Sequence, residues 1–147
     1  MTQVGFYHCT RSKPFDVVPV LAGKAIEAGH KLAVHASDDT DLDALDRHLW
    51  TYDAASFLPH GRDNAAMQPV LLTDGFEPAN GADVLICVGG KLPGDASAFA
   101  RVLYLFDGGD ADAVKAARAH WRALSGKADV EPVYWTQGDR GGWQKAG

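Results

Sequence analysis

The sequence predicts a three-layer α/β domain with a mostly parallel sheet flanked by helices. Short apolar runs alternate with longer segments of helical periodicity, which is the pattern of such domains. The runs at residues 84–88 and 102–106 are apolar almost throughout, as expected for strands buried on both faces of a parallel sheet. The length of 147 residues, with 46% hydrophobic and 22% charged residues, suits a single globular domain.

Strands are expected wherever a short apolar run lies between turn residues. These runs are residues 4–9, 32–36, 70–73, 84–88, 102–106 and, as a short last strand, 133–135. Residues 51–69 show no clear period and contain proline, glycine and asparagine. We therefore interpret this segment as a functional loop, in which a short strand is an option.

Three helices are expected between these strands. The first has Asp16 as its N-cap and Gly29 at its C-terminal stop. The second follows Ser37 and carries leucines on one face. The third begins in residues 107–110, which include Asp107 and Asp110, because negative charge stabilises a helix N-terminus, and it runs to about Ser125.

One domain is predicted over residues 1–136, followed by a flexible tail over residues 137–147 in which Trp143 looks exposed. Two cysteines are too few for a disulfide framework, and no signal peptide or membrane-spanning run is visible. We therefore expect a cytoplasmic protein without membrane contact. The net charge of −5 disfavours a protein whose whole surface binds nucleic acid.

The chain lacks the motifs of nucleotide and metal sites. Residues 9–12, which follow the first strand, contain none of the glycines of a dinucleotide-binding turn, and Gly90-Lys91 is not part of a P-loop. No histidines pair at i, i+4 spacing and no cysteines form a C-x-x-C motif, so neither a metal nor a cofactor is expected. Cys9 and Cys87 are interpreted as small buried side chains rather than nucleophiles.

Two features rise above this background. The first is an aromatic and apolar pair of segments, Leu49–Tyr52 and Ser56–Gly61, that is unfavourable to leave in water. These segments either fold back onto the core or form an exposed docking site.

The second feature is a stripe of cations on the last helix. Lys115, Arg118 and Arg122 recur at i, i+3 and i+7 and therefore share one helix face. With Lys127 they give residues 113–127 four cations and no acid. The stripe is either a solvated helix face or a site for a short acidic peptide, whose carboxylates arginine can hold.

The chain resembles the family of the chi subunit of bacterial DNA polymerase III. The most specific similarity is Leu49-Trp50 followed by Ser56-Phe57-Leu58-Pro59-His60. Other segments that agree in order and spacing are Phe6-Tyr7, Gly29-His30-Lys31, Ala117-Arg118 and the run Gln68–Thr73, which looks like alphaproteobacterial members. The resemblance covers roughly residues 3–125.

This resemblance implies a Rossmann-like fold without a nucleotide and no catalysis by the subunit itself, within a DNA-directed DNA polymerase (nucleotidyltransferase) assembly. The family bridges the clamp-loader complex to single-stranded DNA-binding protein (SSB), whose acidic C-terminal tail ends in phenylalanine with a free carboxylate. In other bacteria the psi subunit links chi to the clamp loader. We therefore expect a monomer alone, or a heterodimer with psi or an equivalent subunit, that meets DNA only indirectly.

The resemblance also implies roles for individual residues. Arg118 and Arg122 correspond by position to the family's basic residues for the SSB tail, and Lys115 joins them by spacing only. Trp50 corresponds to the family's tryptophan after the second helix and would form a wall of the pocket for the terminal phenylalanine. The expected docking loop toward psi or the clamp loader consists of Phe57, Leu58, Pro59 and His60, with core packing as its alternative role.

Residues 107–109 depart from the family, because many relatives carry an apolar, proline-containing turn there. Two other functions stay open. A small α/β enzyme would use a site near Cys87, with a deep pocket at the carboxyl ends of the strands. A weak single-stranded DNA binder would stack bases on Trp50 and Trp121.

Overall fold

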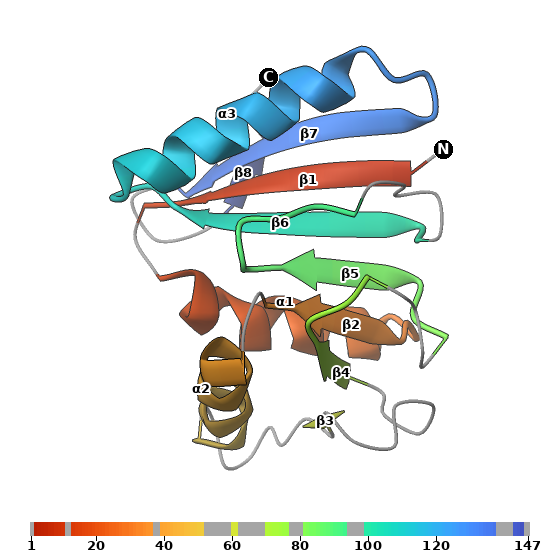
Figure 1. Cartoon of the computed structure of the whole chain (residues 1–147). Coiled ribbons are helices and arrows are strands. Elements are labelled where there is room, and N and C mark those ends of the chain that lie inside the picture. The colour runs from red at the N-terminus through yellow and green to blue at the C-terminus, as the bar shows by residue number, and fades with distance from the viewer. Residues whose placement is uncertain are drawn as a thin grey trace.

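The computed structural model of the chain describes residues 2–10, 13–36, 39–51, 60–61, 70–76, 81–93, 99–137 and 143–145. The elements within these ranges follow the alternating order that the sequence predicts (Figure 1). In chain order they are β1 (Thr2–Cys9), α1 (Pro14–Glu27), β2 (Leu32–His35), α2 (Asp39–Thr51), β3 (His60–Gly61), β4 (Val70–Thr73), β5 (Val84–Cys87), β6 (Arg101–Asp107), α3 (Ala111–Ser125), β7 (Val130–Gln137) and β8 (Trp143–Lys145).

The strands form one sheet in the order β3-β4-β2-β5-β6-β1-β7-β8. All of the described strand pairs are parallel except β7 with β8, which is antiparallel. Parallel strands need crossover connections, and α1 lies in the connection from β1 to β2 while α3 lies in the connection from β6 to β7. The predicted mostly parallel sheet is confirmed.

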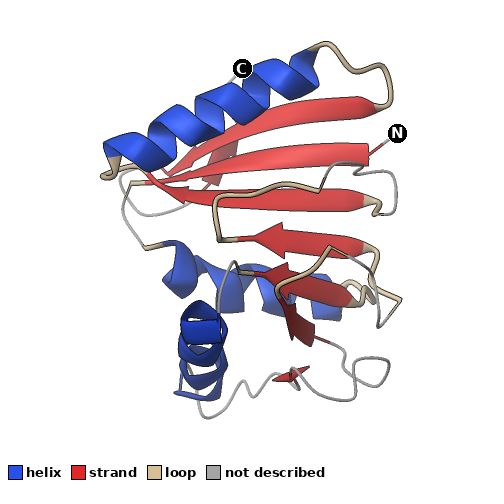
Figure 2. Ribbon diagram, in the orientation of Figure 1, coloured by secondary structure: helices blue, strands red, loops and turns tan. Residues whose placement is uncertain are grey.

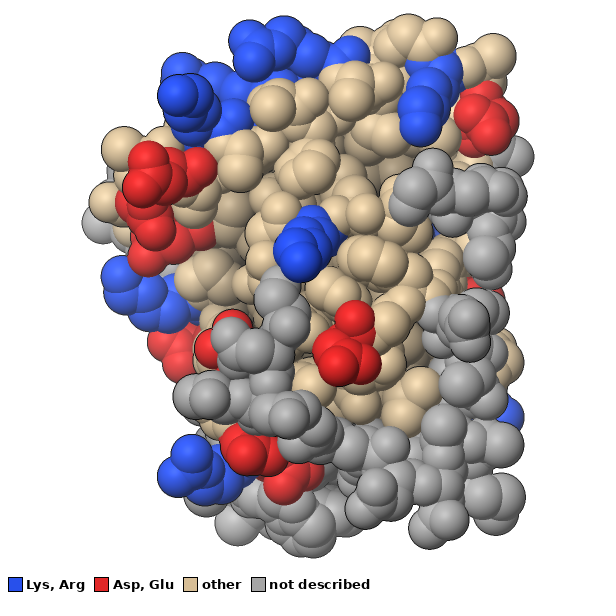
Figure 3. Space-filling model, in the orientation of Figure 1, with Lys and Arg blue, Asp and Glu red and all other residues tan. Residues whose placement is uncertain are grey.

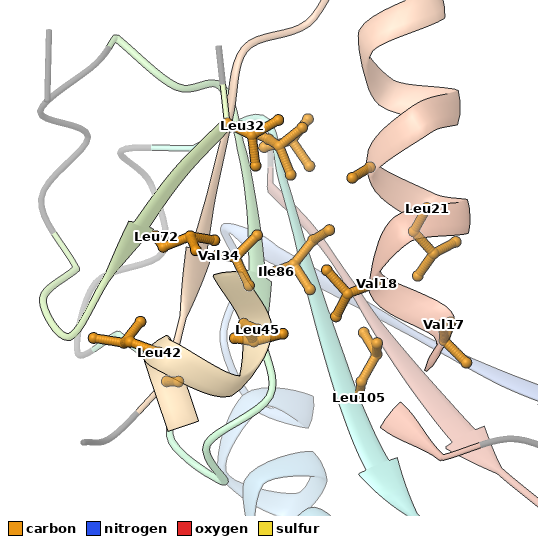
Figure 4. Packing of buried hydrophobic residues seen from close by; sticks show 14 of the residues in the cluster. Val17, Val18, Leu21, Leu32, Val34, Leu42, Leu45, Leu72, Ile86 and Leu105 are labelled. Atoms are coloured by element: carbon orange, nitrogen blue, oxygen red, sulfur yellow. The ribbon is translucent and has the colours of Figure 1, made fainter. Parts of the chain in front are cut away.

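Helices cover both faces of this sheet (Figure 2). Successive strand residues point to opposite faces, so each strand contributes to two cores. On one face Val34 packs in a cluster with Val18 of α1 and Leu45 of α2 (Figure 4). On the other face Phe6 packs in a second cluster with Ala117 of α3. The three-layer α/β prediction is therefore confirmed.

The helix ends follow capping rules, with one correction to the sequence prediction. α1 begins at Pro14 and its N-cap is Lys13, not Asp16, because a proline at the first position of a helix needs no partner for an N–H group. Asp16 lies in the first turn instead, where its charge complements the helix dipole. The predicted acidic start of α3 is confirmed, since the Asp110 side chain accepts hydrogen bonds from two backbone N–H groups of the first turn.

The last long strand, β7, is longer than the sequence predicts. β7 covers eight residues, Val130–Gln137, where the sequence predicts only residues 133–135. The difference arises at Pro132, which is disfavoured inside a sheet. Pro132 is tolerated because β8 pairs only with residues 135–137, so β7 has a single neighbour at the proline.

The prediction that Trp143 is exposed is wrong. Its side chain is half-buried, and its ring meets the Tyr7 ring edge-on with the centroids 5.0 Å apart. The antiparallel pairing of β8 with β7 places it there. The flexible tail over residues 137–147 otherwise stays a prediction.

The neighbouring strands β1 and β6 are followed by helices on opposite faces of the sheet. β1 leads into α1, and β6 leads into α3. Many α/β proteins bind nucleotides in the crevice at such a switch point. Here the two connections are tied together, because Lys13 Nζ lies 3.0 Å from Asp107 Oδ2 and the Gly108 N–H donates to the Cys9 carbonyl at 2.9 Å. The junction fixes the start of α3 against the end of β1.

Candidate functional site

A cleft of about 360 Å³ lies between α3 and the strands β1, β6 and β7. Ligand pockets in proteins measure roughly 300–1,000 Å³, so the cleft has the size of a binding site. Aromatic and apolar side chains form its walls, and two arginines stand at its edge. The described lining residues, none of which is a carboxylate, are His8, Phe106, Val114, Ala117, Arg118, Trp121, Arg122 and Tyr134.

α3 forms one wall of the cleft because its sequence is amphipathic. Ala117 and Trp121 face the sheet, and the Trp121 ring meets Phe6 edge-on with the centroids 5.3 Å apart. Arg118 and Arg122 each follow one position later, are exposed, and lie side by side because they are four positions apart. Figure 3 shows basic side chains gathered along α3 and acidic side chains near its N-terminal end. Two predicted tail-binding residues are therefore adjacent on the cleft.

Lys115, the third member of the predicted stripe, is exposed but does not line the cleft. Each helical residue turns about 100° around the axis, so Lys115 points further from the Trp121 side of α3 than Arg118 does. It extends the positive charge of the helix beyond the cleft and does not contact its interior.

A polar pair from two strands lies at the floor of the cleft. The Tyr134 hydroxyl oxygen and His8 Nδ1 are 2.6 Å apart. The His8 ring also stacks on Phe106, with the centroids 4.9 Å apart and the planes inclined by 22°. Burial and, to a smaller extent, the positive charge of Arg118 lower the pKa of His8 below its ordinary value. The neutral imidazole is thus the favoured form beside the arginine.

Gly108, in the connection from β6 to α3, provides the space for His8. A Cβ atom at Gly108 would overlap the His8 ring and would also lie 3.1 Å from the Cys9 carbonyl oxygen. The His8 imidazole and the glycine at position 108 therefore fit together sterically.

The other predicted site residues are not among the described lining residues of this cleft. Trp50 lies in the last turn of α2, which packs on the face of the sheet opposite α3, and its side chain lies outside the described residues. Phe57, Leu58 and Pro59 also lie outside the described residues, and His60 is described only as backbone of β3. The docking role of this loop stays a prediction.

His8 and Tyr134 line the cleft but are not among the site residues predicted from the sequence. The alternation of the first strand does place His8 on the same face as Phe6, which is a usable signal. The meeting of His8 with Tyr134 depends on the pairing of β1 with β7, across 126 positions of sequence. No local pattern in the sequence reveals that pairing.

The geometry gives no support to an enzyme site near Cys87 or to base stacking on Trp50 and Trp121 together. Cys87 is fully buried, and burial raises the pKa of its thiol, so it is not a ready nucleophile. Trp50 and Trp121 belong to helices on opposite faces of the sheet and do not form one stacking surface.

The described ranges contain neither a candidate metal site nor a candidate membrane span. No group of three histidine, cysteine, aspartate or glutamate side chains in these ranges is placed to hold a metal ion. None of the helices in these ranges combines the length and apolar character that crossing a membrane requires.

Together, the fold and the cleft define a three-layer α/β domain with an aromatic, arginine-bordered cleft of ligand-binding size. Residues 1–130 match the family described as DNA polymerase III chi subunit, HolC. The chain is 34% identical over 109 residues to the DNA polymerase III subunit chi of Pseudomonas aeruginosa, a match that covers 71% of this chain and 77% of that protein. It is 29% identical over 91 residues to the probable DNA polymerase III subunit chi of Rickettsia prowazekii, which covers 60% of this chain and 55% of that protein.

The chain therefore belongs to the DNA polymerase III chi-subunit family. This confirms the resemblance stated from the sequence. Membership in the family supports an accessory role in DNA replication.

Proposed function

We propose that this chain is a non-catalytic subunit of the DNA polymerase III holoenzyme in the cytoplasm, and that it binds the acidic, phenylalanine-terminated tail of SSB in the α3 cleft. The position of Arg118 and Arg122 beside the aromatic walls of Phe106 and Trp121 carries this proposal. A peptide that ends in an aromatic residue and a carboxylate needs both kinds of surface within a few ångströms of each other.

Each part of the cleft suits one part of such a tail. The guanidinium of Arg118 can hold the terminal carboxylate through two hydrogen bonds. The phenyl ring would lie between Phe106 and Trp121, where aromatic pairs gain more than their buried area alone supplies. Arg122 and, outside the cleft, Lys115 would attract the aspartates that precede the terminal residue.

The proposal includes a second surface, which links the chain to the clamp loader through psi or an equivalent subunit. Its candidate is the segment Phe57–His60. β3, which contains His60, lies at the far edge of the sheet from β7, which contributes Tyr134 to the cleft. Partners at the two places would not collide, as a bridging subunit requires.

A peptide titration tests the tail site. We expect a fluorescent peptide with the SSB tail sequence to bind with a Kd of about 1 μM, which corresponds to roughly 8 kcal/mol. A twin peptide without the final phenylalanine should bind far more weakly. Arg118→Ala should weaken binding about tenfold or more, because a hydrogen-bonded charge pair is lost. Lys24→Ala, which removes a cation from the other face, is the matched control and should bind normally.

Full affinity in Arg118→Ala, or equal binding of the two peptides, would rule out this site. The bridging role needs a separate measurement by sedimentation of SSB, this chain and psi together. The Leu58→Asp variant should no longer bind psi but should still bind the SSB tail. Retention of psi by that variant would reject the docking loop and leave the tail site standing.

A further inference from the structure

A second cleft, of about 570 Å³, lies on the face of the sheet opposite α3, between α1 and the strands β6, β1, β7 and β8. α1 packs with β2 and β6 on this face, and the described part of the chain places no helix over β7 and β8. Strands therefore form the floor of this cleft, and α1 forms one of its walls.

Three aromatic side chains on three consecutive strands form the floor. Tyr7 on β1 and Trp135 on β7 are register partners, and their rings are nearly parallel, with the centroids 6.1 Å apart and the planes inclined by 12°. Trp143 on β8 meets Tyr7 edge-on. Gly5 permits this arrangement, because a Cβ atom there would lie 2.8 Å from the Tyr7 ring. A continuous aromatic surface results.

Cations border this surface. Lys24 of α1 and Arg101 of β6 line the cleft, and no carboxylate does so among the described lining residues. Within the described ranges neither cation forms an ion pair with a carboxylate. Lys145 is the cross-strand partner of Trp135 and so lies on the same face of the sheet. The described charged residues that line the cleft are therefore cations, in a chain whose net charge is −5.

We propose that this second cleft binds single-stranded nucleic acid, with bases stacked on Tyr7, Trp135 and Trp143 and phosphates near Lys24 and Arg101. Aromatic side chains on neighbouring strands of an open sheet, bordered by cations, are the recurring means of binding unpaired bases. An acidic peptide without aromatic residues would use the cations and leave the rings without a partner. An apolar helix would bury the cations without a counter-charge, which is costly.

This inference does not depend on binding of the SSB tail and concerns other residues. The test is fluorescence anisotropy of the purified full chain with labelled oligodeoxythymidylate of about 15 nucleotides, a length near the upper site size of sheet-based binders. We expect binding at low salt that weakens as salt rises. A duplex of the same length should bind more weakly, because its bases are already stacked and paired.

Variants locate the site. Lys24→Ala/Arg101→Ala should weaken oligonucleotide binding about tenfold, and Trp143→Ala by a similar factor because one stacking ring is lost. Trp143 lies on the edge strand, so its variant should retain the far-ultraviolet circular dichroism of the wild type. Arg118→Ala, the matched control on the other face, should bind the oligonucleotide normally.

Three results would overturn the proposal. The oligonucleotide could fail to bind at low salt, the duplex could bind as tightly as the single strand, or Arg118→Ala could lose as much oligonucleotide affinity as Lys24→Ala/Arg101→Ala. Competition separates the two clefts. The SSB tail peptide should not displace the oligonucleotide, and displacement would mean that both ligands use the same cleft. Failure of the tail peptide to bind at all would leave the oligonucleotide result unaffected.

Discussion

His8 occupies the volume that a side chain at Gly108 would need, so the end of β1 and the connection into α3 fit together only with glycine at that position. Gly108→Ala should push the imidazole off Phe106 and the Tyr134 hydroxyl. We expect the free energy of unfolding, measured in urea, to fall by about 1–3 kcal/mol, which is typical of overpacking.

Gly23→Ala is the control for this substitution. Gly23 lies inside α1, and a Cβ atom there would meet no atom within 4 Å. Alanine should raise the free energy of unfolding by about 0.5–1 kcal/mol, because it is the better helix former. A Gly108→Ala variant as stable as the wild type would contradict the tight fit at His8.

His35 should make the protein less stable in mild acid. Its side chain is only 2% exposed, its Nε2 lies 3.1 Å from the Asp74 carbonyl oxygen, and its Nδ1 has no hydrogen-bond partner among the described residues. Burial lowers the pKa of His35 below the ordinary value of 6.5. The unfolded chain therefore takes up the proton first as pH falls.

Stability should accordingly be greatest above pH 6.5 and decline as pH falls through the lowered pKa of native His35, with His8 acting in the same direction. Urea midpoints between pH 8 and pH 5 measure this decline. His35→Phe keeps a ring against Phe76 and should make the decline shallower. An unchanged decline in that variant would show that another group is responsible.

Lys115 and Arg118 should differ in their effect on the SSB tail peptide. Lys115 lies outside the cleft, so Lys115→Ala should weaken binding less than about fivefold, as exposed charges do. Its main effect should be slower association at low salt. Stopped-flow measurements give both rates, and a loss in Lys115→Ala as large as that in Arg118→Ala would mean that the tail lies along the helix surface.

Both thiols should be unreactive in the folded protein. Cys9 and Cys87 are buried, and burial raises the pKa of Cys9 to about 12 and that of Cys87 further still. A thiol reagent at pH 8 should modify them only after denaturant unfolds the chain. Rapid modification of one native thiol would revive the hypothesis of an enzyme site near Cys87.

Local signals explain which parts of the fold could be predicted. The apolar runs at 84–88 and 102–106 predict buried strands, and Asp110 predicts the start of α3, because each signal lies within a few residues of the feature it specifies. Arg118 and Arg122 were placed on one face by helical spacing alone. Trp143 was misjudged because glycine and alanine around it suggest a loose tail, whereas its burial depends on contact with Tyr7, 136 positions earlier.

The alternation of β1 has a consequence for how many ligands the domain can hold. His8 lines one cleft and its neighbour Tyr7 lines the other, so a single strand forms part of both, back to back. Ligands on the two faces would not compete for space. If one partner carries both the tail and a bound nucleic-acid strand, binding of the tail on one face would raise the effective concentration of that strand at the other face. Two weak contacts would then act together as one long-lived attachment.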